Sequence, residues 1–216
     1  MSAAKQIIVV GAGIIGASIA WHLAKAGAKV TIVADSGAGG VATPNSFAWI
    51  NASWGNPQPY FRLRTRSMAE WTRLAQDLPG IPLAWCGGLC WDLPLAELEA
   101  YAAEHSGWGY GIERVDRAEA ARIEPNLAEL PDFALHVPGE GVAEPVAAAQ
   151  ALLADAELRG ARVMTGTTVS ALIQANGRIT GADTSTGPIA ADEVVIAAGG
   201  GSPAIAATAG IKLPIE

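Results

Sequence analysis

A glycine-rich segment close to the N-terminus has the residue types and spacing that bind a phosphate group. Residues 11–16 read GAGIIG and fit the pattern G-x-G-x-x-G. In this pattern the first glycine permits a tight turn, the second lets a pyrophosphate approach the backbone, and the third lets a helix pack close to a sheet. The free N–H groups and the positive dipole end of that helix attract phosphate. The residues expected at the phosphate are Gly11, Gly13, Ile14, Ile15 and Gly16.

This motif requires a strand before it and a helix after it. Residues 6–10 are mostly apolar and β-branched, which predicts a buried strand. Residues 14–26 predict a helix that ends at Gly27, and residues 30–33 predict a second buried strand. The order strand, turn, helix, strand is a βαβ unit with a parallel sheet. The context favours a dinucleotide site over a glycine turn that binds nothing.

The motif also expects an acidic residue at the end of the second strand, where it binds the ribose hydroxyls. The expected position holds Ala34, and Asp35 follows it. Asp35 can reach the ribose if the strand end shifts slightly; otherwise this contact is missing. NADP is disfavoured because it calls for a nearby arginine, and the next basic residue is Arg62.

The rest of the chain predicts an α/β fold with an insertion. Helices are expected at 60–78, 95–105, 117–123 and 145–159, and strands at 112–115, 133–137, 162–164, 169–174, 178–185 and 193–197, with strand-like residues in 83–93. Asn176-Gly177 predicts a hairpin. We interpret residues 1–78 and 141–216 as one discontinuous Rossmann-like domain, in which the first βαβ unit and the strands of the last third of the chain belong to one sheet. Residues 79–140 are interpreted as part of an inserted α+β domain.

Composition narrows the classes of protein further. The net charge of -7 and pI near 5.0 argue against a nucleic-acid partner. Cys86 and Cys90 lack the further ligands of a metal site and are interpreted as reduced thiols, which favours the cytoplasm. Residues 7–24 carry no charged side chain and resemble a signal peptide or short membrane span. The interrupting glycines and the strand that follows oppose both interpretations.

Three further segments, taken with the motif, resemble the D-amino-acid oxidase/sarcosine oxidase/glycine oxidase family of FAD-dependent oxidoreductases. Residues 39–46, GGVATPNS, resemble a family loop that runs beside the pyrophosphate and the flavin ring. Residues 166–169, GTTV, resemble a strand whose backbone contacts the adenine, and residues 194–200, VVIAAGG, resemble a strand that closes on the cofactor. The resemblance adds these residues to the expected FAD site: Ala42, Thr43, Asn45, Ser46, Val169, Ala198, Gly199 and Gly200.

The resemblance implies an enzyme that oxidises the C–N bond of an amino acid or secondary amine, with hydride transfer to the flavin N5. Members of the family continue beyond the position of Glu216, so we expect a fragment or subunit of a longer enzyme that needs its C-terminal half or a partner subunit. No catalytic residue is assigned. An NAD-dependent Rossmann dehydrogenase and a non-catalytic FAD-binding module are the alternatives. Three arginines spread around one predicted helix suit exposed faces, although one could meet a substrate carboxylate: Arg62, Arg64 and Arg66.

Overall fold

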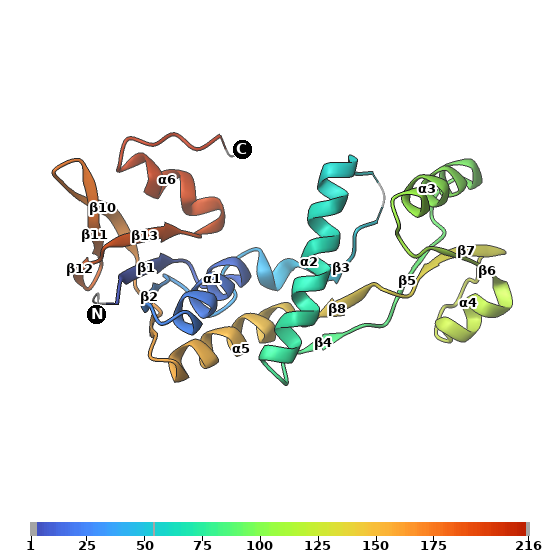
Figure 1. Cartoon of the computed structure of the whole chain (residues 1–216), viewed down its shortest axis with the longest axis horizontal. Coiled ribbons are helices and arrows are strands. Elements are labelled where there is room, and N and C mark those ends of the chain that lie inside the picture. The colour runs from blue at the N-terminus through green and yellow to red at the C-terminus, as the bar shows by residue number, and fades with distance from the viewer. Residues whose placement is uncertain (1–3, 54, 215–216) are drawn as a thin grey trace. The chain divides into compact units, whose positions relative to one another are not determined.

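The computed structural model describes residues 4–53 and 55–214, which form two compact units (Figure 1). Unit 1 consists of Met1–Phe47 and Glu144–Glu216, and unit 2 consists of Ala48–Ala143. The chain therefore passes from unit 1 to unit 2 and back once. These divisions fall at different residues from the predicted domain limits, because the helix expected at 60–78 lies in unit 2 rather than with the glycine motif.

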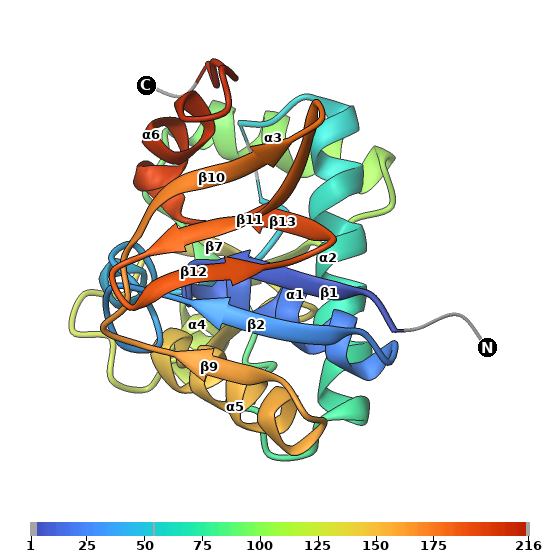
Figure 2. The same cartoon turned by 90° about the vertical axis from the view of Figure 1, so that its left-hand side faces the viewer.

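The centre of unit 1 is a four-stranded parallel sheet (Figure 2). Its order is β13 (Glu193–Ile196), β1 (Gln6–Val10), β2 (Lys29–Val33) and β9 (Arg162–Met164). Val9 pairs with Val195 on one side and with Ile32 on the other, and both Val9 and Ile32 are fully buried. A continuous apolar strand is what a sheet covered on both faces requires. The predicted α/β fold with a parallel sheet is confirmed.

Two helices of unit 1 pack against each other beside this sheet (Figure 1). They are α1 (Ile14–Lys25) and α5 (Pro145–Leu158). Trp21 is fully buried, and its indole Nε1–H donates to Asp155 Oδ2 at 2.7 Å. Arg159 binds the same Asp155 oxygen at 2.5 Å. The indole thus keeps a polar partner inside an apolar layer, as a buried tryptophan usually does.

A second sheet of unit 1 is antiparallel and consists of β10 (Val169–Ala175), β11 (Arg178–Thr184) and β12 (Gly187–Ala190). Ala175 pairs with Arg178 across Asn176-Gly177, so the predicted hairpin is confirmed. The expectation that these strands continue the first sheet is wrong. Val169 and Ala182 pack instead on Ile8 and Val10, so the hairpin covers a face of the parallel sheet. Three short helices complete the unit: η1 (Thr43–Asn45), η2 (Gly199–Gly201) and α6 (Ser202–Ala207).

Unit 2 contains two small antiparallel sheets and three helices (Figure 1). One sheet has the order β3 (Trp49–Ile50), β8 (Gly141–Ala143) and β4 (Leu83–Ala84). The other has the order β5 (Gly88–Cys90), β7 (Phe133–Val137) and β6 (Glu113–Asp116). The helices are α2 (Gln58–Asp77), α3 (Leu95–Gly107) and α4 (Arg117–Ile123). Across the described residues of both units, no helix combines the length and apolarity that a membrane span requires.

Candidate dinucleotide-binding site

Two of the three motif glycines in unit 1 are required by the protein's own packing. Gly11 follows β1 with φ +110°, and a Cβ there would lie 2.3 Å from the Ala197 carbonyl oxygen. A Cβ on Gly16 would lie 2.0 Å from the Gly11 carbonyl oxygen. Both distances are shorter than any tolerated contact with a backbone atom. Gly11 and Gly16 therefore let β1, α1 and the end of β13 come together, as the motif predicts.

Gly13 differs from its two neighbours in the motif. It is the N-cap of α1 with an ordinary φ of -68°. A Cβ at this position would lie 3.4 Å from Thr43 Oγ1 and 3.5 Å from the Gly39 carbonyl oxygen, which are ordinary contacts. The fold itself would thus accept alanine at Gly13. Internal packing therefore does not explain a glycine at this position, whereas the close approach of a ligand to the backbone would.

The loop 39–46 packs against the first turn of α1. The Gly39 N–H donates to the Ala12 carbonyl oxygen at 2.8 Å, and the Ile14 N–H donates to Thr43 Oγ1 at 3.1 Å. Thr43 is buried, so its hydroxyl is fixed at the helix terminus. The first N–H groups of a helix have no partner inside the helix, and Thr43 satisfies one of them. The structure therefore brings Thr43 to the motif, as the sequence predicts.

The other predicted residues of this region lie on the surface of unit 1. Ile15 is 65 % exposed, although it is apolar and lies in the first turn of α1. Ala42, Asn45 and Ser46 are exposed around η1. The Asn45 side chain donates from Nδ2 to the Val41 carbonyl oxygen at 2.7 Å, which stabilises the loop.

The end of β2 is joined to the chain that leaves β9. The Ala34 N–H donates to the Met164 carbonyl oxygen, and the Thr167 N–H donates to the Ala34 carbonyl oxygen, both at 2.9 Å. Ala34 is buried, whereas Asp35 is exposed just beyond it. Thr167 is also buried, and it is not among the residues predicted for the site. The signal that could have identified it is its position within the segment GTTV. Asp35 is thus the acidic side chain at this strand end.

The remaining predicted residues lie at the start of β10 and just after the end of β13. Val169 is buried in the apolar cluster with Ile8 and Val10, so its side chain belongs to the core and its backbone is what remains for a ligand. Ala198 packs against the same cluster at the start of η2. Gly199, with φ +56°, and Gly200 are exposed. The end of β13 and the glycine motif meet at Gly11 and Ala197.

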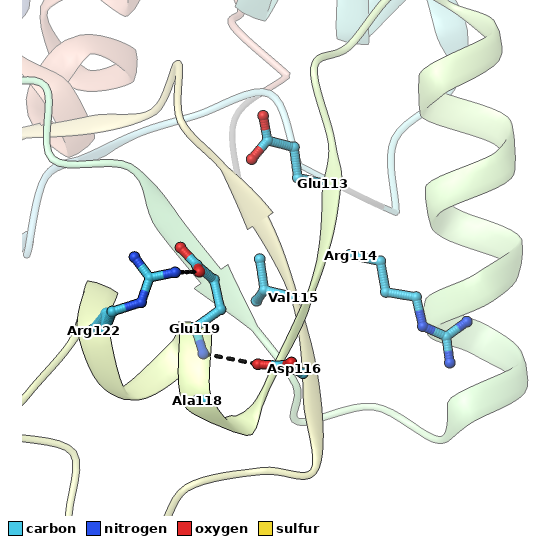
Figure 3. Close-up of a pocket in the computed structure, with 7 residues that line it drawn as sticks. All are labelled: Glu113, Arg114, Val115, Asp116, Ala118, Glu119 and Arg122. Carbon is cyan, nitrogen blue, oxygen red and sulfur yellow. Dashed lines mark hydrogen bonds and ion pairs between the residues drawn. The ribbon is translucent and has the colours of Figure 1, made fainter.

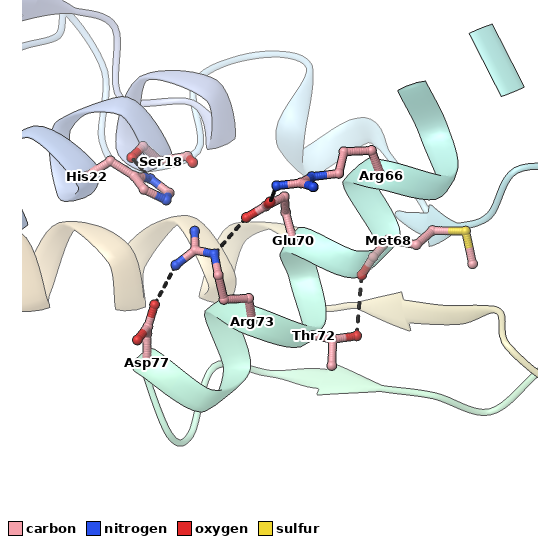
Figure 4. Close-up of polar contacts among 8 residues, drawn as sticks. All are labelled: Ser18, His22, Arg66, Met68, Glu70, Thr72, Arg73 and Asp77. Atoms are coloured by element: carbon pink, nitrogen blue, oxygen red, sulfur yellow. Dashed lines mark hydrogen bonds and ion pairs between the residues drawn. The ribbon is translucent and has the colours of Figure 1, made fainter. Parts of the chain in front are cut away.

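Two of the three predicted arginines of α2, Arg64 and Arg66, have structural partners, and Arg62 is exposed. Arg64 donates from Nε to the Asn51 carbonyl oxygen at 3.0 Å and from Nη1 to the Ser53 carbonyl oxygen at 3.3 Å. Arg66 binds Glu70 at 2.6 Å in a ladder that continues through Arg73 (Figure 4). Arg64 is therefore committed to the backbone, which disfavours its interpretation as a carboxylate-binding residue.

A hollow of about 440 Å³ in unit 2 is a weaker candidate for a binding site (Figure 3). Its charged side chains are largely paired: Arg122 binds Glu119, and Arg114 binds Glu99 at 2.9 Å. Asp116 accepts the Glu119 N–H at 2.8 Å as the N-cap of α4. Arg114, Asp116, Glu119 and Arg122 thus already have partners within unit 2, which makes them weaker candidates for ligand binding. Within residues 4–53 and 55–214, no group of three or more His, Cys, Asp or Glu side chains could hold a metal ion.

The comparison with protein families identifies the class of protein. The family described as "FAD dependent oxidoreductase" (DAO) matches residues 6–216, and the chain therefore belongs to it. The predicted family resemblance is confirmed.

Individual relatives agree with this family. The chain is 31% identical over 98% of its length to "Uncharacterized oxidoreductase YurR" of Bacillus subtilis, covering 59% of that protein. It is 31% identical over 98% of its length to a glycine oxidase of Pseudomonas putida, covering 60% of it. Among solved structures, it resembles L-proline dehydrogenase from P. horikoshii with a TM-score of 0.84 and 27% identity, covering all of this chain and 58% of that one. The chain spans about three fifths of the length of these relatives.

Proposed function

We propose that this chain is the FAD-binding part of an oxidoreductase that oxidises the C–N bond of an amino acid or a secondary amine. FAD would supply the acceptor for the hydride that leaves the carbon next to the nitrogen. The family is FAD-dependent, and the named relatives include a glycine oxidase and an L-proline dehydrogenase. The activity is proposed for an enzyme in which this chain is joined by the segment that its longer relatives have in addition.

One observation carries the cofactor proposal. Gly11 and Gly16 are fixed by the packing of unit 1, whereas the space around Gly13 would accept a Cβ. A glycine without an internal steric reason, at the N-terminus of a helix that follows a parallel strand, suits the close approach of a pyrophosphate. The residues present therefore fit FAD.

Each group of residues has a role in this proposal. The first turn of α1 would bind the pyrophosphate through main-chain N–H groups such as those of Gly13 and Ile15, beside the Ile14 N–H that Thr43 already accepts. Thr43 would hold the loop 39–46 against that turn through its bond to Ile14. Asp35 would bind the ribose hydroxyls of the adenosine, and the backbone at Val169 would contact the adenine. Ala198 to Gly200 would line the site from the end of β13.

Replacement of Gly13 tests the cofactor site. We expect Gly13→Val to abolish FAD binding while leaving the far-ultraviolet circular dichroism and the unfolding transition near those of the wild type. Gly37→Ala is the matched control, since nothing lies within 4 Å of a Cβ at Gly37. FAD content is measured by the visible spectrum after reconstitution. A Gly13→Val protein that retained the wild-type flavin content would exclude the motif as the cofactor site.

The reaction class needs a separate measurement. Reduction of a redox dye that depends on an added amino acid or secondary amine would support the proposed oxidation. A protein that binds FAD but reduces no dye with such substrates, even when joined to the additional segment of its relatives, would instead be a non-catalytic flavin-binding module. A protein that binds NAD and not FAD would be a dehydrogenase of a different kind.

A further inference from the structure

Glu140 is a carboxylate buried inside unit 2. It lies in the turn between β7 and β8, and 1 % of the residue is exposed. Oε1 accepts the Ser53 hydroxyl at 2.5 Å and the Tyr110 hydroxyl, and Oε2 accepts the Trp49 indole N–H at 2.8 Å. A buried acid is costly unless it is hydrogen-bonded, and these three donors meet that requirement.

The two hydroxyl groups that contact Glu140, those of Ser53 and Tyr110, both donate to it. Tyr110 accepts the Ala52 N–H at 2.9 Å, which leaves its own O–H to donate to Glu140. Ser53 accepts the Tyr101 hydroxyl at 3.3 Å and donates to Glu140. None of the hydrogen bonds found for the Glu140 side chain among the described residues offers it an acceptor. The pattern suits a carboxylate, which accepts hydrogen bonds and cannot donate them.

The positively charged Arg64 binds the same loop, 51–53, that contacts the Glu140 carboxylate. Arg64 binds the carbonyl oxygens of Asn51 and Ser53 and also the Asn51 side-chain oxygen. The pKa of the Glu140 carboxyl is raised by burial, and the three hydrogen bonds and Arg64 offset part of that rise. The loop 51–53 therefore lies between a buried anion and a cation, each bound to it directly.

Glu140 also lies where the chain enters and leaves unit 2. The chain enters through β3 and leaves through β8, and these strands pair with Trp49 opposite Val142 and Ile50 opposite Gly141. The Ala143 N–H adds a bond to the Ala48 carbonyl oxygen at 3.2 Å. Two-residue and three-residue strands have few ladder bonds of their own, so they need other anchors.

The Glu140 carboxylate supplies such an anchor. Its bond to the Trp49 indole joins β3 to the turn that opens β8. Its backbone carbonyl accepts the Gly87 N–H at 2.8 Å, and a Cβ on Gly88 would lie 2.3 Å from Oε2, so a glycine at position 88 leaves room for the carboxylate.

We propose that Glu140 is the positioning residue of unit 2, ionised at neutral pH, and that its carboxylate fixes the loop 51–53 and the two strands through which the chain enters and leaves the unit. This role is independent of the proposed cofactor.

Hydrogen exchange of the whole chain tests the anchor. We expect Glu140→Gln to raise the amide exchange rates of residues 49–53 and 141–143 by about tenfold or more, because each lost bond to a charged group weakens local protection. The amides of β1 and β13 should keep their wild-type rates. Glu144→Gln is the matched control, since it removes an exposed carboxylate four residues further on. Unchanged exchange at 49–53 in Glu140→Gln would overturn the proposal.

The charge of Glu140 is tested by the Trp49 indole. In nitrogen-15-labelled protein, the Trp49 indole N–H resonance, assigned by its loss in Trp49→Phe, should move when Glu140→Gln removes the anion and should not move in Glu144→Gln. It should also shift when the wild type is acidified. If Glu140→Gln does not fold, two other measurements test the ionised anchor. They are the acid titration of the wild-type indole resonance and the amide exchange rates of residues 49–53 in Trp49→Phe. An indole resonance insensitive to acid, together with unchanged exchange in Trp49→Phe, would exclude an ionised anchor.

Discussion

The two units organise their polar centres by opposite means. The candidate site of unit 1 depends on main-chain atoms and on missing side chains: Gly11 and Gly16 permit close packing, and the first turn of α1 is what remains for a ligand. The centre of unit 2 is made of side chains that converge on Glu140. The first arrangement is the proposed place for an outside ligand, whereas the second satisfies its hydrogen-bonding groups internally. The proposed role of the unit 1 site is to bind a ligand, and the proposed role of the Glu140 centre is to position its own loop and strands.

This difference also decides what each centre tolerates. A main-chain site fails when an added side chain occupies space that the packing needs, as at Gly11 and Gly16, or that the proposed ligand needs, as at Gly13. A side-chain centre fails when a group is removed, because a buried partner is left unsatisfied. The predictions below test this contrast, from the largest expected effect to the smallest.

Gly16→Ala should have the largest effect. A Cβ at this position would lie 2.0 Å from the Gly11 carbonyl oxygen and 2.9 Å from its carbon, so α1 must move away from the sheet. We expect a loss of about 4 kcal/mol or more in the free energy of unfolding, in the range of severe core disruptions. Urea unfolding followed by circular dichroism measures it, with Gly37→Ala as the control. A Gly16→Ala protein of wild-type stability would show that the contact is not rigid.

Tyr110→Phe should have the next largest effect. The change removes a bond to the buried Glu140 carboxylate and leaves the Ala52 N–H without its acceptor. We expect a loss of about 3 kcal/mol in the free energy of unfolding. Tyr101→Phe is the matched control, because it removes one 3.3 Å bond to Ser53 and should cost about 1 kcal/mol. Equal losses in the two variants would contradict a centre organised around Glu140.

The glycine motif of unit 1 was predicted from the sequence, whereas the Glu140 centre of unit 2 was not. The reason is the separation of the contributing residues along the chain. The motif occupies residues 11–16, and its strand, turn and helix are neighbours in sequence, so local pattern sufficed. The partners of Glu140 are separated from it by 91 residues at Trp49, 87 at Ser53 and 30 at Tyr110. No periodic pattern connects such positions. A lone Glu in a PGEG turn is typical of an exposed loop.

The missed strands have a related explanation. Trp49–Ile50 and Gly141–Ala143 are too short for the alternation that reveals a strand, and they exist because they pair with each other. Gly187–Ala190 contains Pro188, which argues against a strand when read alone. The hairpin at Asn176 was predicted from its turn, but a turn does not say which sheet its strands join. That choice depends on Val169 packing on Ile8 and Val10.

Asp35→Ala tests whether the site of unit 1 uses any acidic side chain. Asp35 is the exposed acid at the end of β2, beyond the buried Ala34. Loss of a charge-assisted hydrogen bond to the ribose should weaken FAD affinity by about 1.5–3 kcal/mol, or roughly 10- to 150-fold. Titration with FAD measures this, and Asp35→Asn should lose less. Unchanged affinity in Asp35→Ala would remove Asp35 from the site and leave it made of main chain.

The smallest effect concerns His105, which lies beside the Glu140 centre in unit 2. Its ring is 1 % exposed, and neither ring nitrogen has a hydrogen-bond partner among the described residues. Tyr101, Phe61 and Trp108 surround it with ring-centroid distances of 4.6, 5.4 and 4.5 Å. Burial lowers the pKa of His105, while Glu104, whose Oε2 lies 3.6 Å from Nδ1, acts in the opposite direction. Burial therefore favours the neutral imidazole in the folded protein.

A lowered pKa in the folded state fixes the sign of the pH dependence. The unfolded chain takes up a proton near pH ~6.5 that the folded chain does not, so this contribution to stability is complete above that pH and is lost as the pH falls below it. We expect the free energy of unfolding to fall by at most about 1.4 kcal/mol per pH unit from this group. His105→Phe should flatten the profile in this window and should raise stability, because it removes two unpaired nitrogens from an aromatic cluster. Glu140 has the opposite sign, because its pKa is raised, and it is common to both proteins. The difference between the two urea-unfolding profiles therefore isolates His105, and parallel profiles would mean that the ring is already solvated or paired in the folded protein.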